Sequence, residues 1–192
     1  MAKFPETITN EEVTQLPALE FPGRMVVVDK LQMVNQACDD LLSHKIIGFD
    51  TETRPSFKAG KVNKVALLQL STFECCYLFR LCTMRLDKAI IKVLESQDVT
   101  KVGVAIRDDL KALQKLRHFQ PRGFVDLQSI VGDYGIKELS LRKLAAVVLD
   151  GRISKAQRLS NWEAAELTQA QKLYAATDAW VSVDIYEHLH EL

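Results

Sequence analysis

Cysteine, glycine, proline and long apolar runs are all scarce in this sequence. Its 192 residues include four cysteines, eight glycines and five prolines, and no stretch is of low complexity, which excludes collagen-like, fibrous and disordered classes. No apolar run reaches the roughly 18 residues of a membrane-spanning helix, and residues 1–10 lack the apolar segment of a signal peptide. We therefore expect a folded intracellular protein, located in the cytoplasm, with no membrane partner.

The few cysteines show no spacing that indicates a metal or redox site. They are Cys38, Cys75, Cys76 and Cys82, and no two of them form a C-x-x-C pair. Cys75 and Cys76 are adjacent, so in a strand they would point to opposite faces of the sheet. We expect all four to be buried, reduced thiols.

Net charge is also absent, because 25 Lys and Arg balance 25 Asp and Glu. This excludes an overall field that attracts a polyanion, so contacts with nucleic acid would have to come from local patches. Residues 54–64 and 137–158 are locally basic. Their basic members include Arg54, Lys58, Lys61 and Lys64 in the first stretch, which has no acid, and Lys155 and Arg158 in the second. Solvated loops and helix faces explain such stretches unless catalytic acids lie beside them.

What is present is the alternating pattern of one α/β domain. Residues 1–22, polar and interrupted by proline, are expected to form an N-terminal extension that packs on a domain spanning residues 23–192. Apolar, β-rich runs predict strands at residues 25–28, 46–51, 65–70, 75–81, 102–106 and 124–125. Helical periodicity and capping signals predict helices at residues 10–16, 29–42, 87–95, 108–116 and 140–150, and a long last helix that begins at the capping box of Thr168 and Gln171.

Two carboxylates stand two residues apart at the end of the strand predicted at 46–51. Asp50 and Glu52 would share one face of that strand, and like charges so close repel unless a cation joins them. With 13 Asp and 12 Glu in the chain, roughly one D-x-E is expected by chance, so the spacing alone is weak. The apolar residues just before it are typical of a central strand, however, where two unpaired acids are costly.

A second candidate pair lies on the predicted last helix. Tyr174 and Asp178 are four residues apart, so they share one helix face. The surrounding sequence, LYAATDAW, is otherwise small or apolar, and an Asp enclosed there needs a hydrogen-bond partner or a metal. A surface Asp beside a half-buried Tyr is the ordinary explanation when this pair is taken alone.

A third acidic position lies in VGVAIRDDLKAL, where a β-rich run passes into a helix. Asp108 or Asp109 could simply cap that helix. Together, however, the three segments supply four carboxylates to one domain. Hard oxygen ligands suit Mg²⁺ or Mn²⁺, and several carboxylates suit two such ions that clamp a phosphodiester.

The three segments FDTE, GVAIRDDLKAL and LYAATDAW resemble, in this order, the three motifs of the DEDD-type 3′-5′ exonucleases, in the subgroup with a tyrosine in the third motif. The sequence is especially similar to the ribonuclease D and Werner exonuclease-domain branch, with further agreement at VALLQLST, FVDLQS, LSLRKLA and LSNWEAAELTQAQ. The resemblance spans about residues 45–189, and three motifs in order are far more specific than any one of them.

The resemblance implies an RNase H-like, three-layer α/β fold, with a mixed five-stranded sheet and helices on both faces. Matched motif by motif, it implies catalytic roles for Asp50, Glu52, Asp109, Tyr174 and Asp178, with the four carboxylates holding two divalent cations, Mg²⁺ or Mn²⁺. Asp109 is selected over Asp108 because the second-motif Asp of the family lies four residues before a Leu, here Leu113. Tyr174 would orient the attacking water.

The activity implied is removal of nucleoside 5′-monophosphates from the 3′ end of DNA or RNA, single-stranded or recessed. One departure from much of the ribonuclease D branch is Arg54, where a Trp often follows the acids. We expect contacts with substrate from residues that flank the first and third motifs, namely Arg54, Lys58, Lys61, Lys155 and Arg158.

Other interpretations stay open at this point. A non-catalytic nucleic-acid-binding or scaffold module could use the same fold, and an endonuclease would release oligomers rather than mononucleotides. Trp162 and Trp180 could stack on bases, although packing is the expected role. Asp126 is expected to be a hydrogen-bonded core acid rather than a ligand. Protein partners cannot be read from the sequence.

Overall fold

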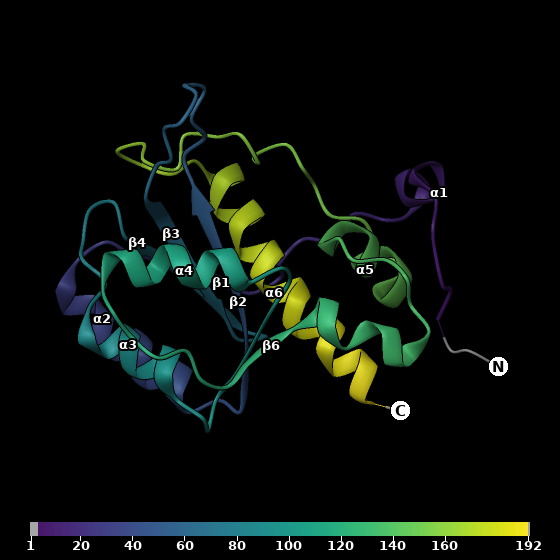
Figure 1. The fold of residues 1–192 in the computed structure, drawn as a ribbon, viewed down its shortest axis with the longest axis horizontal. Helices are drawn as coiled ribbons and strands as arrows, with labels where there is room; N and C mark the ends of the chain where they lie inside the picture. The colour runs from purple at the N-terminus through teal and green to yellow at the C-terminus, as the bar shows by residue number, and fades with distance from the viewer. Residues whose placement is uncertain (1–3, 192) are drawn as a thin grey trace.

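A six-stranded mixed sheet forms the middle layer of the computed structural model, which describes residues 4–191 (Figure 1). Across the sheet the strands are β1 (Arg24–Val28), β4 (Cys75–Arg80), β3 (Val65–Ser71), β2 (Ile46–Thr53), β5 (Thr100–Gly103) and β6 (Phe124–Asp126). The central strands β2, β3 and β4 are antiparallel neighbours. The outer pairings, β1 with β4, β5 with β2 and β6 with β5, are parallel.

The sheet has one strand more than the five that the resemblance implied, and the β-rich run at residues 25–28 had predicted it. The additional strand is β1, whose register places Arg24 opposite Cys75 and Val28 opposite Phe79. Its β-branched residues add to the free edge of β4, so that the backbone groups on that edge are paired rather than left open. The mixed α/β class is confirmed.

Helices cover both faces of the sheet. They are α1 (Asn10–Gln15), α2 (Leu31–Leu42), α3 (Lys88–Glu95), α4 (Arg107–Leu116), α5 (Leu141–Leu149) and α6 (Gln169–His190), with two short 3₁₀ turns, η1 (Leu127–Ser129) and η2 (Val131–Tyr134). One apolar core lies between the sheet and α2, α3 and α4. Two further cores lie under α5 and α6 on the other face. The three-layer arrangement is therefore confirmed.

Two of the capping signals locate the starts of α6 and α5. The Thr168 hydroxyl accepts from the Gln171 amide, and the Gln171 side chain accepts from the Thr168 amide, which is the reciprocal box expected at the start of α6. Ser140 caps α5 by a single bond, its hydroxyl accepting from the backbone amide of Lys143. These local signals are set by residues three apart, so the sequence alone is enough to find them.

The strand expected at residues 102–106 ends at Gly103 instead. Ala105 has a φ of 54°, a left-handed conformation that interrupts the strand. The Asp126 carboxylate accepts hydrogen bonds from the backbone amides of Ala105 and Ile106, at 3.0 and 3.1 Å. Asp126 is therefore hydrogen bonded as predicted, although it is only partly buried, and it fixes the turn that leads into α4.

The four cysteines are free thiols, as expected, but they are not all buried. Cys38, Cys75 and Cys76 are buried, whereas Cys82 is exposed. The expectation fails for Cys82 because β4 ends at Arg80, so Cys82 falls in the turn that follows the strand rather than inside the sheet.

Residues 4–22 run along the α5 and α6 side of the molecule. The Leu19 amide donates to the Arg152 carbonyl at 2.8 Å, and the Phe21 amide donates to the Thr177 hydroxyl at 3.0 Å. The boundary between an extension at 1–22 and a domain at 23–192 stays a prediction, and residues 1–3 and 192 of those ranges lie outside the described residues. No helix within residues 4–191 combines the length and apolar character needed to cross a membrane.

Gly48 allows α6 to lie directly against β2. A Cβ at this position would stand 1.8 Å from the carbonyl oxygen of Ala179, so a larger residue would push the helix off the sheet. Asp178 immediately precedes Ala179. The close approach therefore places Asp178 next to the strand that carries Asp50 and Glu52.

Candidate active site

Three carboxylates from two elements meet where α6 crosses β2. Asp50 and Glu52 alternate along β2 and so share one of its faces, and Asp178 approaches that face from α6. One carboxylate oxygen from each residue can be chosen so that all three lie within 4.8 Å of one another. A bulge between Glu52 and Thr53 ends the regular register of β2 just beyond the acids. Such a spacing of hard oxygen atoms fits a divalent cation of the Mg²⁺ or Mn²⁺ type.

The second motif brings a fourth carboxylate to the same region, and the geometry separates its two candidates. Asp109, in the first turn of α4, is partly buried, and its Oδ1 accepts a hydrogen bond from the hydroxyl of Thr51. The charge of Asp109 raises the pKa of both Asp50 and Glu52, so its carboxylate lies close to theirs. Asp108 is exposed. The structure therefore brings Asp109, and not Asp108, to the acidic cluster.

The carboxyl groups of this cluster all hold their protons more tightly than free Asp or Glu. The pKa of Asp50 is raised well above its usual value, first by burial and then by the charges of Asp178 and Asp109. Burial, followed by the charge of Asp50, raises the pKa of Glu52 to about 10. Burial also raises the pKa of Asp178 to about 7, against an opposing hydrogen bond from Tyr174. A divalent cation would remove this mutual repulsion.

These raised pKa values predict how the stability of the metal-free protein depends on pH. The folded protein retains protons that the unfolded chain loses near pH 4, so unfolding releases protons and the free energy of unfolding falls as pH rises. For Asp178 the fall should run from about pH 4 to the raised pKa of about 7, with a slope of up to about 1.4 kcal/mol per pH unit. Denaturant unfolding in EDTA from pH 5 to pH 8 measures it.

The matched controls for this pH dependence are the Asp178→Asn variant and the wild type in Mn²⁺. The free energy of unfolding of both samples should fall less between pH 5 and pH 8. The variant lacks the carboxyl group that titrates, and in the wild type Mn²⁺ compensates the charge of that group. A free energy of unfolding that falls equally in all three samples would show that other groups cause the pH dependence.

Tyr174 lies one turn before Asp178 on α6 and is held in place by an aromatic neighbour. Its ring centroid is 5.9 Å from that of Trp162, with the two ring planes inclined by 36°. Burial, together with the charges of Asp178 and Glu52, raises the pKa of the hydroxyl. The hydroxyl therefore stays protonated and can act as a hydrogen-bond donor at the edge of the acidic cluster.

Trp162 packs, as expected, rather than offering a face to a base. It is fully buried, between Tyr174 and the apolar core under α6. The second tryptophan, Trp180, is partly buried and its ring lies 6.0 Å from that of Phe21. Both indole rings are therefore part of the packing that positions α6.

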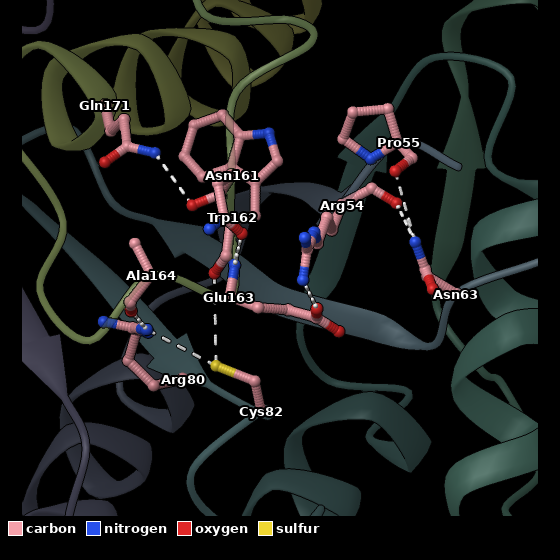
Figure 2. Close-up of polar contacts among 10 residues, drawn as sticks. All are labelled: Arg54, Pro55, Asn63, Arg80, Cys82, Asn161, Trp162, Glu163, Ala164 and Gln171. Atoms are coloured by element: carbon pink, nitrogen blue, oxygen red, sulfur yellow. Dashed lines mark hydrogen bonds and ion pairs between the residues drawn. The ribbon is translucent and has the colours of Figure 1, made fainter. Parts of the chain in front are cut away.

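The predicted substrate-binding residues fall into two groups. Arg54 follows β2 directly, and its Nη1 forms an ion pair with Oε2 of Glu163 at 3.2 Å (Figure 2). Lys58 and Lys61 are exposed and line a hollow together with Arg54. All three belong to the loop that begins where β2 ends.

The other two basic residues lie in the segment that leads into α6. Arg158 is close enough to Tyr174 for its positive charge to lower the pKa of the tyrosine hydroxyl. Burial and the negative charges of the nearby carboxylates raise that pKa by more. Lys155 instead lines a separate hollow with Arg142 and Arg152. The structure therefore groups Arg158 with the acidic cluster, and groups Lys155 with a different part of the surface.

Two residues that support the site were not singled out from the sequence. Thr51 orients Asp109 through its hydroxyl. Gln69 is fully buried on β3, opposite Asp50, and its side chain donates to the carbonyl of Ala175 on α6 at 3.3 Å. A hydrogen bond from Gln69 to Glu52 favours the ionised form of Glu52. A polar side chain inside the apolar run VALLQL was the available signal for Gln69. For Thr51 the only signal in the sequence was its position between two acids.

Comparisons with known proteins agree with this site. A family model described as 3′-5′ exonuclease matches residues 25–192. The bifunctional 3′-5′ exonuclease/ATP-dependent helicase WRN of Mus musculus is 35% identical over 187 residues, which are 92% of this chain and 13% of that protein. Exonuclease 3′-5′ domain-containing protein 2 of Drosophila melanogaster is 35% identical over 183 residues, 87% of this chain and 31% of that protein.

Solved structures share the fold. The Nibbler EXO domain of Aedes aegypti superposes with a TM-score of 0.82 at 24% identity, covering 91% of this chain and 92% of that one. RNase D of Escherichia coli gives a TM-score of 0.78 at 20% identity, covering 86% of this chain and 44% of that one. The expected RNase H-like fold is thereby confirmed.

The chain belongs to the 3′-5′ exonuclease family, and the resemblance to the DEDD-type members seen in the motifs is confirmed. It spans less than a third of the length of the two curated relatives above, 13% and 31% respectively. The match covers all of the sheet except Arg24, the first residue of β1, together with the acidic cluster and α6.

Proposed function

We propose that this chain is a metal-dependent exonuclease that removes nucleoside 5′-monophosphates from the 3′ end of DNA or RNA. The observation that carries the proposal is the convergence of Asp50, Glu52 and Asp178 within 4.8 Å, with Asp109 and Tyr174 beside them. The relatives named as 3′-5′ exonucleases support the direction of digestion. A Trypanosoma brucei RNase D with the same fold was solved with RNA U12, which supports nucleic acid as the substrate class.

In this proposal the carboxylates hold two divalent cations, Mg²⁺ or Mn²⁺. Asp50, Glu52 and Asp178 suit one ion, and Asp50 with Asp109 a second. When bound, such ions lower the pKa of water and neutralise charge that develops on the phosphate. Glu52, with a pKa of about 10 in the metal-free protein, must release its proton before it can act as a ligand.

The protein positions the reaction through Tyr174. Its raised pKa keeps the phenol protonated, so it can donate a hydrogen bond to the attacking water or to a phosphate oxygen. Arg158, near Tyr174, places a positive charge where the phosphate would lie. The Thr51 hydroxyl holds the Asp109 carboxylate by a hydrogen bond, and that carboxylate lies close enough to Asp50 for its charge to act there.

Tyr174→Phe should lower turnover on the order of 10²-fold while leaving metal binding intact, because only the hydroxyl is removed and the ring still packs on Trp162. Initial rates of nucleotide release, compared with the rise in melting temperature on adding Mn²⁺, separate these two effects. Unchanged turnover would exclude Tyr174 from the mechanism, and loss of the Mn²⁺ effect would assign it to the metal site instead.

Digestion of a linear and a circular single strand of the same sequence tests the proposed activity. In Mg²⁺ or Mn²⁺ we expect nucleoside 5′-monophosphates from the linear strand and no cleavage of the circle, which has no 3′ end. Oligonucleotide products, or cleavage of the circle, would identify an endonuclease. Binding without cleavage of either strand would favour a non-catalytic module on the same fold.

A further inference from the structure

The loop at residues 54–63, between β2 and β3, combines positive charge with an exposed aromatic ring. It carries three cations and no acid. The Phe57 side chain is 86% exposed, as is Val62 further along the loop. Figure 1 shows this connection projecting beyond the end of the sheet. Single exposed apolar residues are common, but an aromatic ring among cations, directly after two catalytic carboxylates, has a more specific chemistry.

The base of this loop is fixed relative to the acidic cluster. The Asn63 amide donates to the carbonyls of Arg54 and Pro55, at 2.8 and 3.3 Å, and so closes the loop (Figure 2). Arg54 is also paired with Glu163. Glu163 adjoins Trp162, the residue that packs against Tyr174. The loop is therefore tied both to the strand of the first motif and to the segment that supports the third.

The segment that receives Arg54 is itself held by buried contacts. Arg80, 2% exposed on β4, donates through Nη2 to the Ala164 carbonyl and to the sulfur of Cys82, the latter at 3.4 Å (Figure 2). The Gln171 side chain donates to the Asn161 carbonyl at 3.2 Å. Residues 161–164 thus form a fixed support on which the loop rests through Arg54.

Between its fixed base and its tip, the loop encloses a hollow of about 240 Å³. Phe57 and the three cationic residues Arg54, Lys58 and Lys61 are among the residues that line it. Cations beside an aromatic face are the combination that binds single-stranded nucleic acid, because phosphates pair with the charges and an unpaired base stacks on the ring. A base within a duplex is already stacked and paired, and could not reach the ring.

We propose that this loop binds an unpaired nucleotide of the substrate upstream of the bond that is cut. Phe57 stacks on its base, and Lys58 and Lys61 contact the adjoining phosphates. The inference rests on the proposed function, since it assumes that the 3′-terminal phosphodiester lies at the carboxylates. It adds a substrate class, because the enzyme then needs at least a short single-stranded 3′ segment.

Equilibrium binding measured on the inactive Asp178→Asn chain tests this, since substrate survives the measurement. The probes are a fluorescent single-stranded 12-mer, a blunt duplex, and a 12-mer of equal charge whose 3′ half is abasic. Phe57→Ala should weaken binding of the normal single strand on the order of 10-fold and leave the other two unchanged. Phe57→Trp should restore the affinity, and Val62→Ala, equally exposed on the same loop, should have no effect.

The phosphate contacts have their own readout. Lys58→Gln combined with Lys61→Gln should reduce the slope of log affinity against log salt by about 1.4, roughly 0.7 for each phosphate on a single strand. The proposal is overturned if Phe57→Ala binds all three probes as the parent does, or weakens all three equally. Because no cleavage is needed, failure of the exonuclease activity would show separately, as intact substrate with the wild-type chain.

Discussion

Replacing Asp178 with Asn should abolish nucleotide release, lowering the rate on the order of 10³-fold or more, and should stabilise the metal-free protein at the same time. Asp178 contributes one of the three oxygen atoms that meet within 4.8 Å, so the cation site loses a ligand. The amide carries no charge, which removes the repulsion that, after burial, raises the pKa of Asp50 most. We expect the free energy of unfolding in EDTA at pH 8 to rise by about 1 kcal/mol or more.

These opposite signs are what distinguish a functional acid from a structural one. A residue that holds the fold together would lower both activity and stability when changed. Steady-state rates and urea unfolding of the same preparation give both numbers. A variant that unfolds in EDTA more readily than the wild type would contradict the assignment of Asp178 to a cation site.

The second large effect is expected at the first turn of α4, where two adjacent acids form a matched pair. Asp109→Asn should lower the rate on the order of 10²- to 10³-fold, because this carboxylate lies close enough to the acidic cluster to raise the pKa of its members. Asp108→Asn changes the same charge on an exposed side chain and should leave the rate within about threefold of the wild type. Parallel initial rates in Mg²⁺ compare the two directly.

Thr51 offers a second test of the same contact. Thr51→Val keeps the shape of the side chain but removes the hydroxyl that donates to Asp109, and it should lower the rate about 10- to 100-fold, as loss of a residue that orients a ligand does. The opposite order of effects, with Asp108→Asn more damaging than Asp109→Asn, would show that the motif spacing selected the wrong acid.

The resemblance of three motifs to the exonuclease family selected the acids of this site, and their local spacing predicted which of them share a face. Residues two apart in a strand and four apart in a helix share a face whatever the rest of the fold does. This is enough to pair Asp50 with Glu52 and Tyr174 with Asp178. Their convergence depends on Gly48, where the absence of a Cβ lets α6 touch β2, and no local pattern reveals that contact.

What the sequence could not predict rests on contacts between distant residues. The ion pair of Arg54 with Glu163 joins positions 109 residues apart, and the bond from Arg80 to Ala164 joins positions 84 apart. The sequence showed β1 as a β-rich run. Its parallel pairing with β4 depends on which edge of the sheet is free, and no local pattern shows this. The exposure of Cys82 likewise depends on where β4 ends, a boundary that periodicity leaves uncertain by a few residues.

The most direct test of the central claim is a time course with 5′-labelled single-stranded DNA and RNA in Mg²⁺, Mn²⁺ or EDTA, run beside the Asp178→Asn variant. The acidic cluster predicts a ladder that shortens from the 3′ end in the presence of metal, absent in EDTA and absent in the variant. Substrate that stays intact with the wild-type chain in every metal, or a ladder that persists in the variant, would contradict it.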